Sequence, residues 1–426
     1  MSANIEILHG RLVDASRQLD RVASLYLADG TIAAVGEAPA GWKADKTLDA
    51  RGKVVCPGLV DLSARLREPG SEHKATLESE MLAAVAGGVT TLVCPPDTDP
   101  PLDEPGLVEM LKRRAGTLER AQVYPLGALT RGLQGTALAE MAELTDAGCI
   151  GFSNADLPVT DTTVLYRALQ YAATFGYPVW LRPQEDYLSR GGIAHDGEVA
   201  SRLGLPGIPV SAETIAISTI VTLMRETGAR VHLMRVSSSA GVELVRAAKA
   251  EGLPLSADVG IHHLLLTDRD IGYFDPQFRF SPPLRSPRDR EALGAAVIDG
   301  TIDAIASDHT PVDDDEKNVP FGEAAPGATG LELLLPLALK WAEQMQWRDA
   351  DVLARITSAP AALLGLSCGT LAAGAPADLC IYDPAAFWAV TRETLRSQGK
   401  NSPWLRREMQ AKVVTTLVAG RVVYAA

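Results

Sequence analysis

Residues 54–62 read VVCPGLVDL, and this short apolar run is the first of eight that recur through the middle of the chain. Amphipathic stretches, with apolar residues three and four positions apart, separate the runs and are expected to be helices. Strands alternating with helices predict a parallel α/β sheet, and eight such units over about 250 residues predict a (β/α)8 barrel of the TIM type. The other seven runs are TTLVCPP (90–96), QVYPLGAL (122–129), GCIGFSN (148–154), PVWLRP (178–183), RVHLMRVS (230–237), PLSADVG (254–260) and AIASDHTP (304–311).

The two ends of the chain differ from this middle part, because they contain strands and turns rather than helical patterns. Each end holds a Gly-turn signal of similar form, DGTIAAVG (29–36) and GTLAAGAPADL (369–379). Neither end is long enough to bury a core alone. We therefore predict one small β domain built from residues 1–54 and 365–426, and a barrel that spans residues 55–364.

Composition restricts the partners and the location of the protein. A net charge of −13 disfavours binding to nucleic acid and to anionic membranes. Charged and polar residues interrupt the first twenty positions, so we expect neither a signal peptide nor a membrane-spanning helix, and we expect a cytoplasmic protein. The five cysteines are odd in number and lack CxxC spacing, which favours buried free thiols over disulfides or a zinc cluster.

Several motifs spread over nearly the whole chain resemble the amidohydrolase superfamily, and within it the dihydroorotases. Such enzymes interconvert N-carbamoyl-aspartate and dihydroorotate, and they use zinc to polarise a carbonyl and to generate hydroxide. The motifs that carry the resemblance are PGLVDLSARLREPG (57–70), CPPDTDPP (94–101), HDGEVASRLGLPGIP (195–209), GIHHLLLTD (260–268), SPPLR (281–285), SDHTP (307–311) and APGATGLE (325–332).

Most metal-ligand positions that the resemblance implies hold other residues in this chain. The family motif Asp-x-His-x-His becomes Asp61-Leu62-Ser63-Ala64-Arg65, so Ser63 and Arg65 stand at the histidine positions. A guanidinium stays protonated and offers no lone pair, so Arg65 would repel a metal ion. The resemblance implies further vestigial metal positions at Asn154 (with Asp156 as an alternative register), Pro183, Arg235 and Asp308.

Asp308 is the one family ligand that is retained, and in the family it also moves the proton. Among the substrate positions Arg67 is kept, whereas Asp97 and Ser281 replace asparagines of the family. We therefore predict no metal, no cofactor and no catalytic residues. Because buried charges need partners, we expect one or both of Arg65 and Arg235 to pair with Asp308, with Asp61 or Asp97 as possible further partners.

These replacements predict a pseudo-enzyme that keeps the barrel as a scaffold. The resemblance implies that such a chain supports the assembly and activity of an aspartate transcarbamoylase in pyrimidine biosynthesis, with six catalytic chains and six dihydroorotase-like chains. Two alternatives stay open: a weak, metal-free or differently metallated cyclic amidohydrolase, and a small-molecule sensor that uses Arg67 as a carboxylate anchor.

Other polar residues are interpreted more simply. We expect structural roles for His195, His232, His262 and His263, although His262 and His263 adjoin a strand end. The acidic run 313–316 is expected to be a solvated loop, with a calcium site as the weaker alternative.

Overall fold

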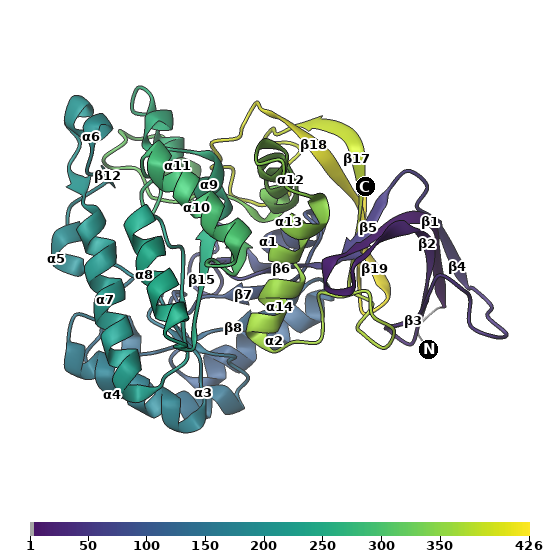
Figure 1. Cartoon of the computed structure of the whole chain (residues 1–426), viewed down its shortest axis with the longest axis horizontal. Helices are drawn as coiled ribbons and strands as arrows, with labels where there is room; N and C mark the ends of the chain where they lie inside the picture. Colours follow the sequence, from purple (N-terminus) through teal and green to yellow (C-terminus); the bar gives the residue numbers. More distant parts are fainter. Residues whose placement is uncertain (1–3) are drawn as a thin grey trace.

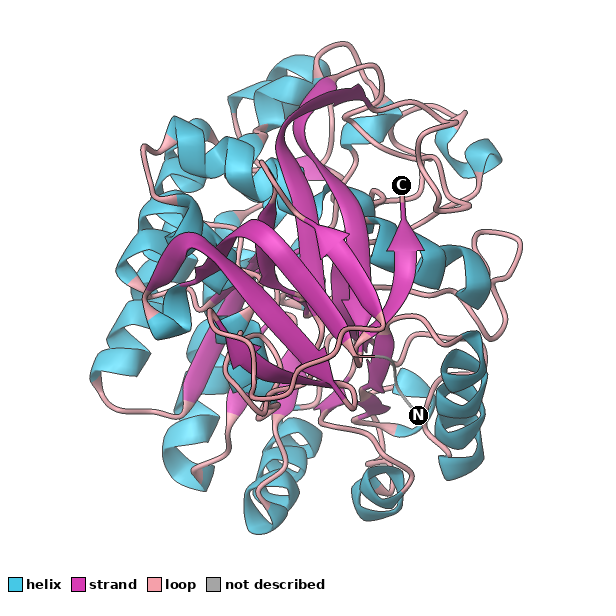
Figure 2. Cartoon of the chain, turned by 90° about the vertical axis from the view of Figure 1, so that its right-hand side faces the viewer, coloured by secondary structure: helices cyan, strands magenta, loops and turns pink. Residues whose placement is uncertain are grey.

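The computed structural model describes residues 4–426; residues 1–3, at the start of the predicted small β domain, lie outside it. A ring of helices surrounds a parallel sheet in one part of the molecule, and a sheet from both chain ends forms the other part (Figure 1). The strands of this second sheet face the viewer in Figure 2. The structure thus has the predicted α/β barrel and an adjoining β domain.

Eight successive parallel segments make the barrel, in the predicted order. Backbone hydrogen bonds close the ring between its last and first segments, from Arg65 N to His309 O (2.9 Å) and from His309 N to Ser63 O (3.1 Å). The strands are β6 (Leu59–Asp61), β7 (Val89–Cys94), β8 (Gln122–Pro125) continued by β9 (Gly127–Ala128), β10 (Phe152–Ser153), β11 (Val179–Leu181), β14 (Val231–Leu233), β15 (Leu255–Gly260) and β16 (Ala304–Ala306).

Helices between the strands cover the outside of the barrel (Figure 1). The outer helices are α1 (Leu77–Ala86), α2 (Pro105–Leu118), α3 (Met141–Asp146), α4 (Thr162–Phe175), α7 (Val210–Thr227), α8 (Ser239–Ala250), α10 (Pro287–Asp299), α12 (Leu334–Gln344), α13 (Asp349–Arg355) and α14 (Ser358–Leu364). Shorter elements near the barrel mouth are α5 (Asp186–Ser189), α6 (Glu198–Leu203), α9 (Ile261–Leu265), α11 (Asp314–Lys317), β12 (Ala194–His195) and β13 (Gly207–Ile208). The 3-10 turns are η1 (Ala15–Arg17), η2 (Arg131–Leu133), η3 (Asp268–Ile271), η4 (Pro276–Phe278) and η5 (Leu331–Leu333).

Helix α10 shows how local sequence sets these boundaries. The Ser286 hydroxyl caps the N-terminus by accepting from Asp289 N, and the Asp289 carboxylate in turn accepts from Ser286 N. Pro287 occupies the first turn, where its missing N–H costs nothing. Gly300 ends the helix with φ 84°, a left-handed conformation that favours glycine.

The sheet of the β domain has the order β19-β18-β17-β5-β1-β2-β3, with β4 beside β1. The two Gly-turn segments contact each other, since Ile32 N donates to Ala375 O (2.9 Å) and Gly374 N donates to Ile32 O (2.8 Å). The strands are β1 (Ile5–Asp14), β2 (Leu19–Ala28), β3 (Thr31–Val35), β4 (Lys46–Asp49), β5 (Val54–Pro57), β17 (Leu379–Ala389), β18 (Glu408–Val418) and β19 (Arg421–Ala425).

The run 54–62 is divided between the two sheets, contrary to its prediction as one barrel strand. Val54–Pro57 forms β5, which pairs with β1 and β17, and only Leu59–Asp61 enters the barrel as β6. Gly58 separates the two strands, and a Cβ at this position would lie 2.1 Å from the Thr90 hydroxyl. The chain therefore turns from one sheet into the other where only glycine fits.

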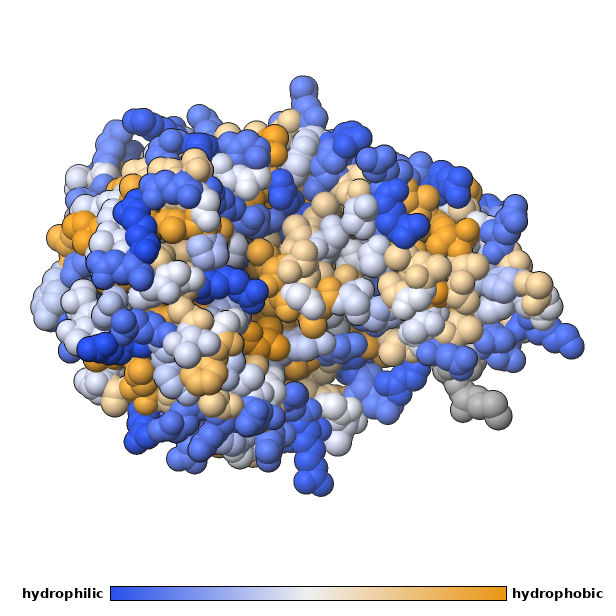
Figure 3. All heavy atoms as spheres, turned by 60° about the horizontal axis from the view of Figure 1, so that its bottom comes forward, coloured by the Kyte–Doolittle hydropathy of each residue, from blue (hydrophilic) through white to orange (hydrophobic). Residues whose placement is uncertain are grey.

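Among residues 4–426, none of the helices combines the length and apolar character needed to cross a membrane. The face seen in Figure 3 is mixed: hydrophilic side chains lie mainly along its edges, and apolar side chains gather between them.

Candidate functional site

Six charged side chains meet at the C-terminal ends of the barrel strands, and we call them the mouth cluster. Each lies at or just beyond the end of a different strand, which is where active sites lie in barrels of this type. The cluster consists of Arg65 (after β6), Asp97 (after β7), Asp156 (after β10), Arg182 (after β11), Arg235 (after β14) and Asp308 (after β16).

Arg65 connects three strand ends through one guanidinium group. Its Nε donates to Asp97 Oδ2 (2.7 Å) and its Nη2 donates to Asp156 Oδ2 (2.8 Å). Nη1 donates to Thr310 Oγ1 (3.0 Å) and lies 3.7 Å from Asp308 Oδ1. Since 5% of this side chain is exposed, the pairs are largely shielded from solvent.

Arg235 approaches the same carboxylates from the opposite side of the barrel mouth. Its Nη1 donates to Asp308 Oδ1 (3.0 Å) and to the Ser281 carbonyl oxygen (3.1 Å), and its Nη2 donates to Asp156. The predicted pairing with Asp308 is confirmed for both arginines, and Asp97 pairs with Arg65. Asp61 takes no part: it accepts from Ser307 N (2.8 Å) and from the Ser307 hydroxyl.

The charges shift the pKa values of the cluster in different directions. Burial would raise the pKa of Asp156, but Arg235, Arg65 and Arg182 together hold it well below its usual range. Burial raises the pKa of Asp308, although Arg235 and Arg65 oppose this. Burial also lowers the pKa of Arg182 to about 10, against the attraction of Asp156. Asp156 is thus the carboxylate most firmly held in its charged form.

Three side chains of this region extend from left-handed backbone positions. Arg67, Arg235 and Asp308 have φ values of 62°, 56° and 49°. Such angles are uncommon for residues other than glycine and cost on the order of 1–3 kcal/mol each when a residue is strained. The surrounding structure holds the three residues in conformations that direct their side chains to the barrel mouth.

The remaining predicted positions lie around the cluster without joining its ion pairs. Asn154 is turned aside, since its Nδ2 donates to Leu133 O (3.1 Å) and Leu157 O (3.0 Å) and its Oδ1 accepts from Thr130. Arg67 Nε donates to Pro311 O (2.8 Å). Ser63 O accepts from His309 N just beyond β16, Ser281 contributes its carbonyl to Arg235, and Pro183 follows Arg182 directly.

The histidines make structural contacts. His232 Nε2 lies 2.9 Å from Asp258 Oδ2, and His309 Nε2 lies 2.6 Å from Glu80 Oε2. His262 Nδ1 accepts from Trp404 Nε1 (3.0 Å), and burial lowers its pKa to about 3. His263 contacts Pro282 O (3.1 Å), and His195 contacts Arg285 (3.3 Å).

The acidic run 313–316, predicted as a solvated loop, instead begins the short helix α11, and three of its carboxylates pair with cations or cap this helix. Glu316 Oε1 accepts from Lys74 Nζ (2.7 Å), and Asp314 pairs with Arg392. Asp313 caps α11 by accepting from Asp315 N (2.9 Å).

The donor set does not fit the zinc pair that the resemblance implies. Zinc binds thiolate, imidazole or carboxylate donors, and across residues 4–426 no three such side chains lie close enough together to hold a metal ion. Each carboxylate of the mouth cluster is already paired with arginine. Two guanidinium cations, Arg65 and Arg235, would also repel a dication within a few ångströms.

Two members of the cluster were missed or given a minor place in the sequence analysis. Asp156 was only the alternative to Asn154, yet it contacts three arginines: Arg65, Arg182 and Arg235. Arg182 was not among the predicted positions, because the resemblance places the vestigial ligand position at Pro183 beside it. Its position at the end of the run PVWLRP was the signal that could have identified it.

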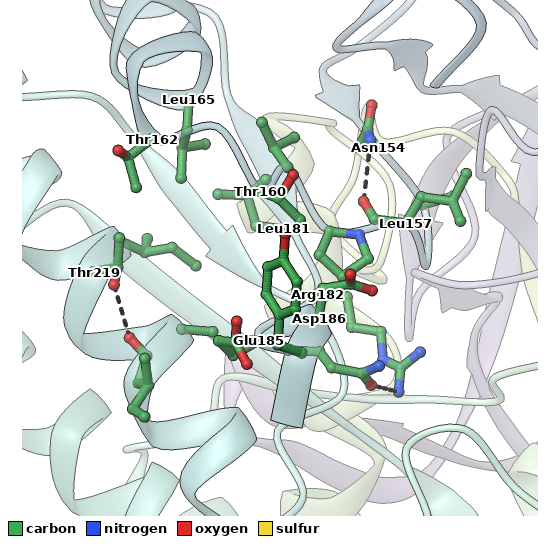
Figure 4. A pocket seen from close by; sticks show the side chains of 18 residues that line it. Asn154, Leu157, Thr160, Thr162, Leu165, Leu181, Arg182, Glu185, Asp186 and Thr219 are labelled. Carbon is green, nitrogen blue, oxygen red and sulfur yellow. Dashed lines mark hydrogen bonds between the residues drawn. The ribbon is translucent and has the colours of Figure 1, made fainter. Parts of the chain in front are cut away.

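A cavity of about 170 Å³ adjoins the cluster on its β10–β11 side (Figure 4). Its inner end reaches Asn154 and Arg182, and its walls include Leu157, Leu181 and Ile220 from the β10 loop, β11 and α7. Arg182 donates to Gln184 Oε1, which also lines the cavity, and it lies close to Asp156 of the mouth cluster. One guanidinium group therefore belongs to both the cavity and the cluster.

Comparisons with known proteins agree with this architecture. A family described as Dihydro-orotase-like matches residues 52–240, and one described as Amidohydrolase family matches residues 199–424. A "Dihydroorotase-like protein" of Pseudomonas putida is 44% identical, with 98% of each chain covered. A "Dihydroorotase" of Anaeromyxobacter dehalogenans is 39% identical over 100% of this chain and 98% of its own. The L-hydantoinase of Arthrobacter aurescens superposes with a TM-score of 0.89 at 26% identity, covering 99% of this chain and 96% of its own.

These comparisons contradict the prediction that the chain is not an enzyme. Some relatives are named dihydroorotase, and a protein of the same fold is named L-hydantoinase. Both are names of catalytic amidohydrolases. The prediction rested on ligand positions alone, and replaced ligands do not by themselves decide whether a site is catalytic. Any reaction at the barrel mouth would use the side chains that meet there.

Proposed function

The chain belongs to the dihydroorotase-like branch of the amidohydrolase family, and we propose that it supports the assembly of an aspartate transcarbamoylase in pyrimidine biosynthesis. In this proposal it works in the cytoplasm, with six copies joining six transcarbamoylase catalytic chains. The role follows from the resemblance to dihydroorotases and does not depend on any reaction at the barrel mouth.

The mouth cluster is the observation that supports this proposal. Arginine and aspartate side chains from six strand ends cross the mouth and connect strands far apart in sequence, such as β6 with β16 through Arg65 and Asp308. Hydrogen-bonded ion pairs of this kind fix the relative positions of the loops that carry them. A barrel with fixed loops offers a partner a surface that needs little ordering on binding.

Mixing the purified chain with an aspartate transcarbamoylase catalytic chain tests the proposal. We expect light scattering to give the mass of a complex with equal numbers of both chains, and transcarbamoylase activity to rise when the complex forms. The matched control is a hydantoinase of the same fold, which should neither associate nor change the activity. A transcarbamoylase chain that stays separate, with unchanged activity in the mixture, would refute the proposal.

A second candidate function is reversible hydrolysis of a cyclic amide by this chain itself. Relatives named dihydroorotase favour it, among them one that is 40% identical over 99% of this chain. Asp308 would carry the proton, because burial raises its pKa and thus favours proton exchange nearer neutral pH.

Assays with dihydroorotate and hydantoin test this second candidate. Asp308→Asn should lower any turnover by about 10²–10⁴-fold, the usual contribution of a positioned acid or base. The exposed Asp20→Asn serves as a control that should keep full activity. Equal turnover by Asp308→Asn and the unchanged protein would exclude Asp308 as the proton carrier.

A further inference from the structure

We propose that Arg65, Arg182 and Arg235 form a binding site for a small carboxylate, and that the chain's own Asp156 occupies this site. Arg65 Nη2 donates to Asp156 Oδ2 (2.8 Å), Arg235 donates to Oδ1, and Arg182 Nη1 lies 3.6 Å from Oδ1. Both oxygens of one carboxylate are therefore contacted, by cations from three different strand ends.

Burial makes this site stronger than a surface group of arginines. The exposed fractions of the Arg65, Arg182 and Arg235 side chains are 5%, 5% and 3%. Guanidinium groups removed from water in this way need an anion, because an uncompensated buried charge is costly. Asp97 and Asp308 neutralise only two of the three cations, so removal of Asp156 leaves one positive charge in excess.

Asp156 itself is open to solvent on one side. Its side chain is 32% exposed, whereas Asp308 is 4% exposed, so an anion that replaced the Asp156 carboxylate could enter from outside. The adjoining cavity reaches Arg182 and is lined by apolar side chains such as Leu157 and Leu181 (Figure 4). The site thus suits a carboxylate on a short apolar tail.

Replacement of the tethered carboxylate by a free one tests the proposal. Asp156→Ala removes the carboxylate and leaves space, so sodium acetate should restore thermal stability beyond sodium chloride at the same ionic strength. Above its Kd, acetate should raise the Tm of this variant by about 2 °C for each tenfold increase in concentration. Butyrate should act at lower concentration than acetate if the tail enters the cavity.

Three controls make the result specific. The unchanged protein should not respond, because Asp156 fills the site. Asp156→Asn should not respond either, because the amide keeps the volume without the charge. Asp383→Ala removes a carboxylate that pairs with the single lysine Lys53, and it should also show no specific response.

The possible outcomes distinguish specific binding of a carboxylate from a general effect of salt. An equal acetate response in Asp156→Ala and Asp383→Ala would be a general salt effect and would overturn the proposal, as would no response in Asp156→Ala. If Asp156→Ala does not stay folded, the yield of refolded protein in acetate against chloride replaces the Tm. Equal yields in the two salts would also overturn the proposal.

Discussion

Arg235 is held at the barrel mouth because its side chain is buried and pairs with two carboxylates. Its side chain is 3% exposed, its Nη1 lies 3.0 Å from Asp308, and its Nη2 contacts Asp156. Its Nε has no hydrogen-bond partner among the described residues. The residue therefore contributes through charge pairing, which makes it sensitive to replacement by an apolar side chain of similar length.

We predict that Arg235→Met destabilises the fold by roughly 3–5 kcal/mol, because the buried Asp308 and the partly exposed Asp156 both lose a partner. Urea unfolding followed by circular dichroism measures the free energy of unfolding. Arg11→Met is the matched control, since Arg11 pairs with Asp20 on the exposed surface at 2.7 Å. Such pairs contribute about 0–1 kcal/mol. Equal losses in the two variants would contradict a buried, structural ion pair at Arg235.

Removal of divalent metal should leave the stability unchanged, because guanidinium groups neutralise the carboxylates of the mouth cluster. Dialysis against a chelator should shift the Tm by less than about 1 °C, since a metal that binds only the folded state would otherwise stabilise it. A larger decrease that added zinc reverses would show that a bound ion supports the fold.

Among the elements, the segment 395–404 is attached to the barrel by two acids. Glu80 of α1 accepts from Ser397 Oγ (2.7 Å) and Gln398 N (3.0 Å). Glu332 of η5 accepts from Arg396 N (2.7 Å) and Ser397 N (3.0 Å). Burial raises the pKa of Glu332 from 4.5 to about 7, and the nearby charge of Glu80 adds to this, while the two backbone bonds oppose it.

The raised pKa of Glu332 predicts that stability falls as pH rises from about 4.5 to 7. In this window the folded state keeps a proton that the unfolded state has lost, so higher pH favours unfolding. The effect is at most about 3 kcal/mol. Glu332→Gln should flatten the dependence of the Tm on pH between 5 and 8. Exposed Glu243→Gln serves as the control, and an unchanged slope in Glu332→Gln would refute the assignment.

The strands and helices were predictable because each barrel strand is a short apolar run and each helix repeats its apolar residues at helical spacing. The division of 54–62 between β5 and β6 was not, because both halves are apolar and the turn between them lies at Gly58, where a Cβ would clash with Thr90. At the site, the pairing of Arg65 with Asp308 followed from buried charge. The central place of Asp156 depends on the path of the β10 loop, where Ala155 has φ 50°, and spacing cannot reveal this.

At the scale of the whole molecule, the β domain and the barrel share structure. Strand β5 continues directly into barrel strand β6, and Gly58 N donates to Asp378 O (2.8 Å) beside β17. Thr416 Oγ1 of β18 donates to Val85 O of α1 (2.6 Å), and a Cβ at Gly88 would lie 2.4 Å from Cys380 Sγ. The β domain and the barrel are therefore packed closely against each other along this boundary.

This packing predicts that both parts unfold in one transition. Leu417 of β18 is fully buried in the core of the β domain, with Ile7, Leu27 and Leu379. Leu417→Ala should cost about 2–5 kcal/mol through lost burial and a cavity. If the two parts are coupled, scanning calorimetry should show a single heat-absorption peak moved to lower temperature, whereas a β domain that melts alone would give two peaks. The exposed Val22→Ala, on β2 of the same sheet, should leave the peak nearly in place, because little apolar surface is lost there.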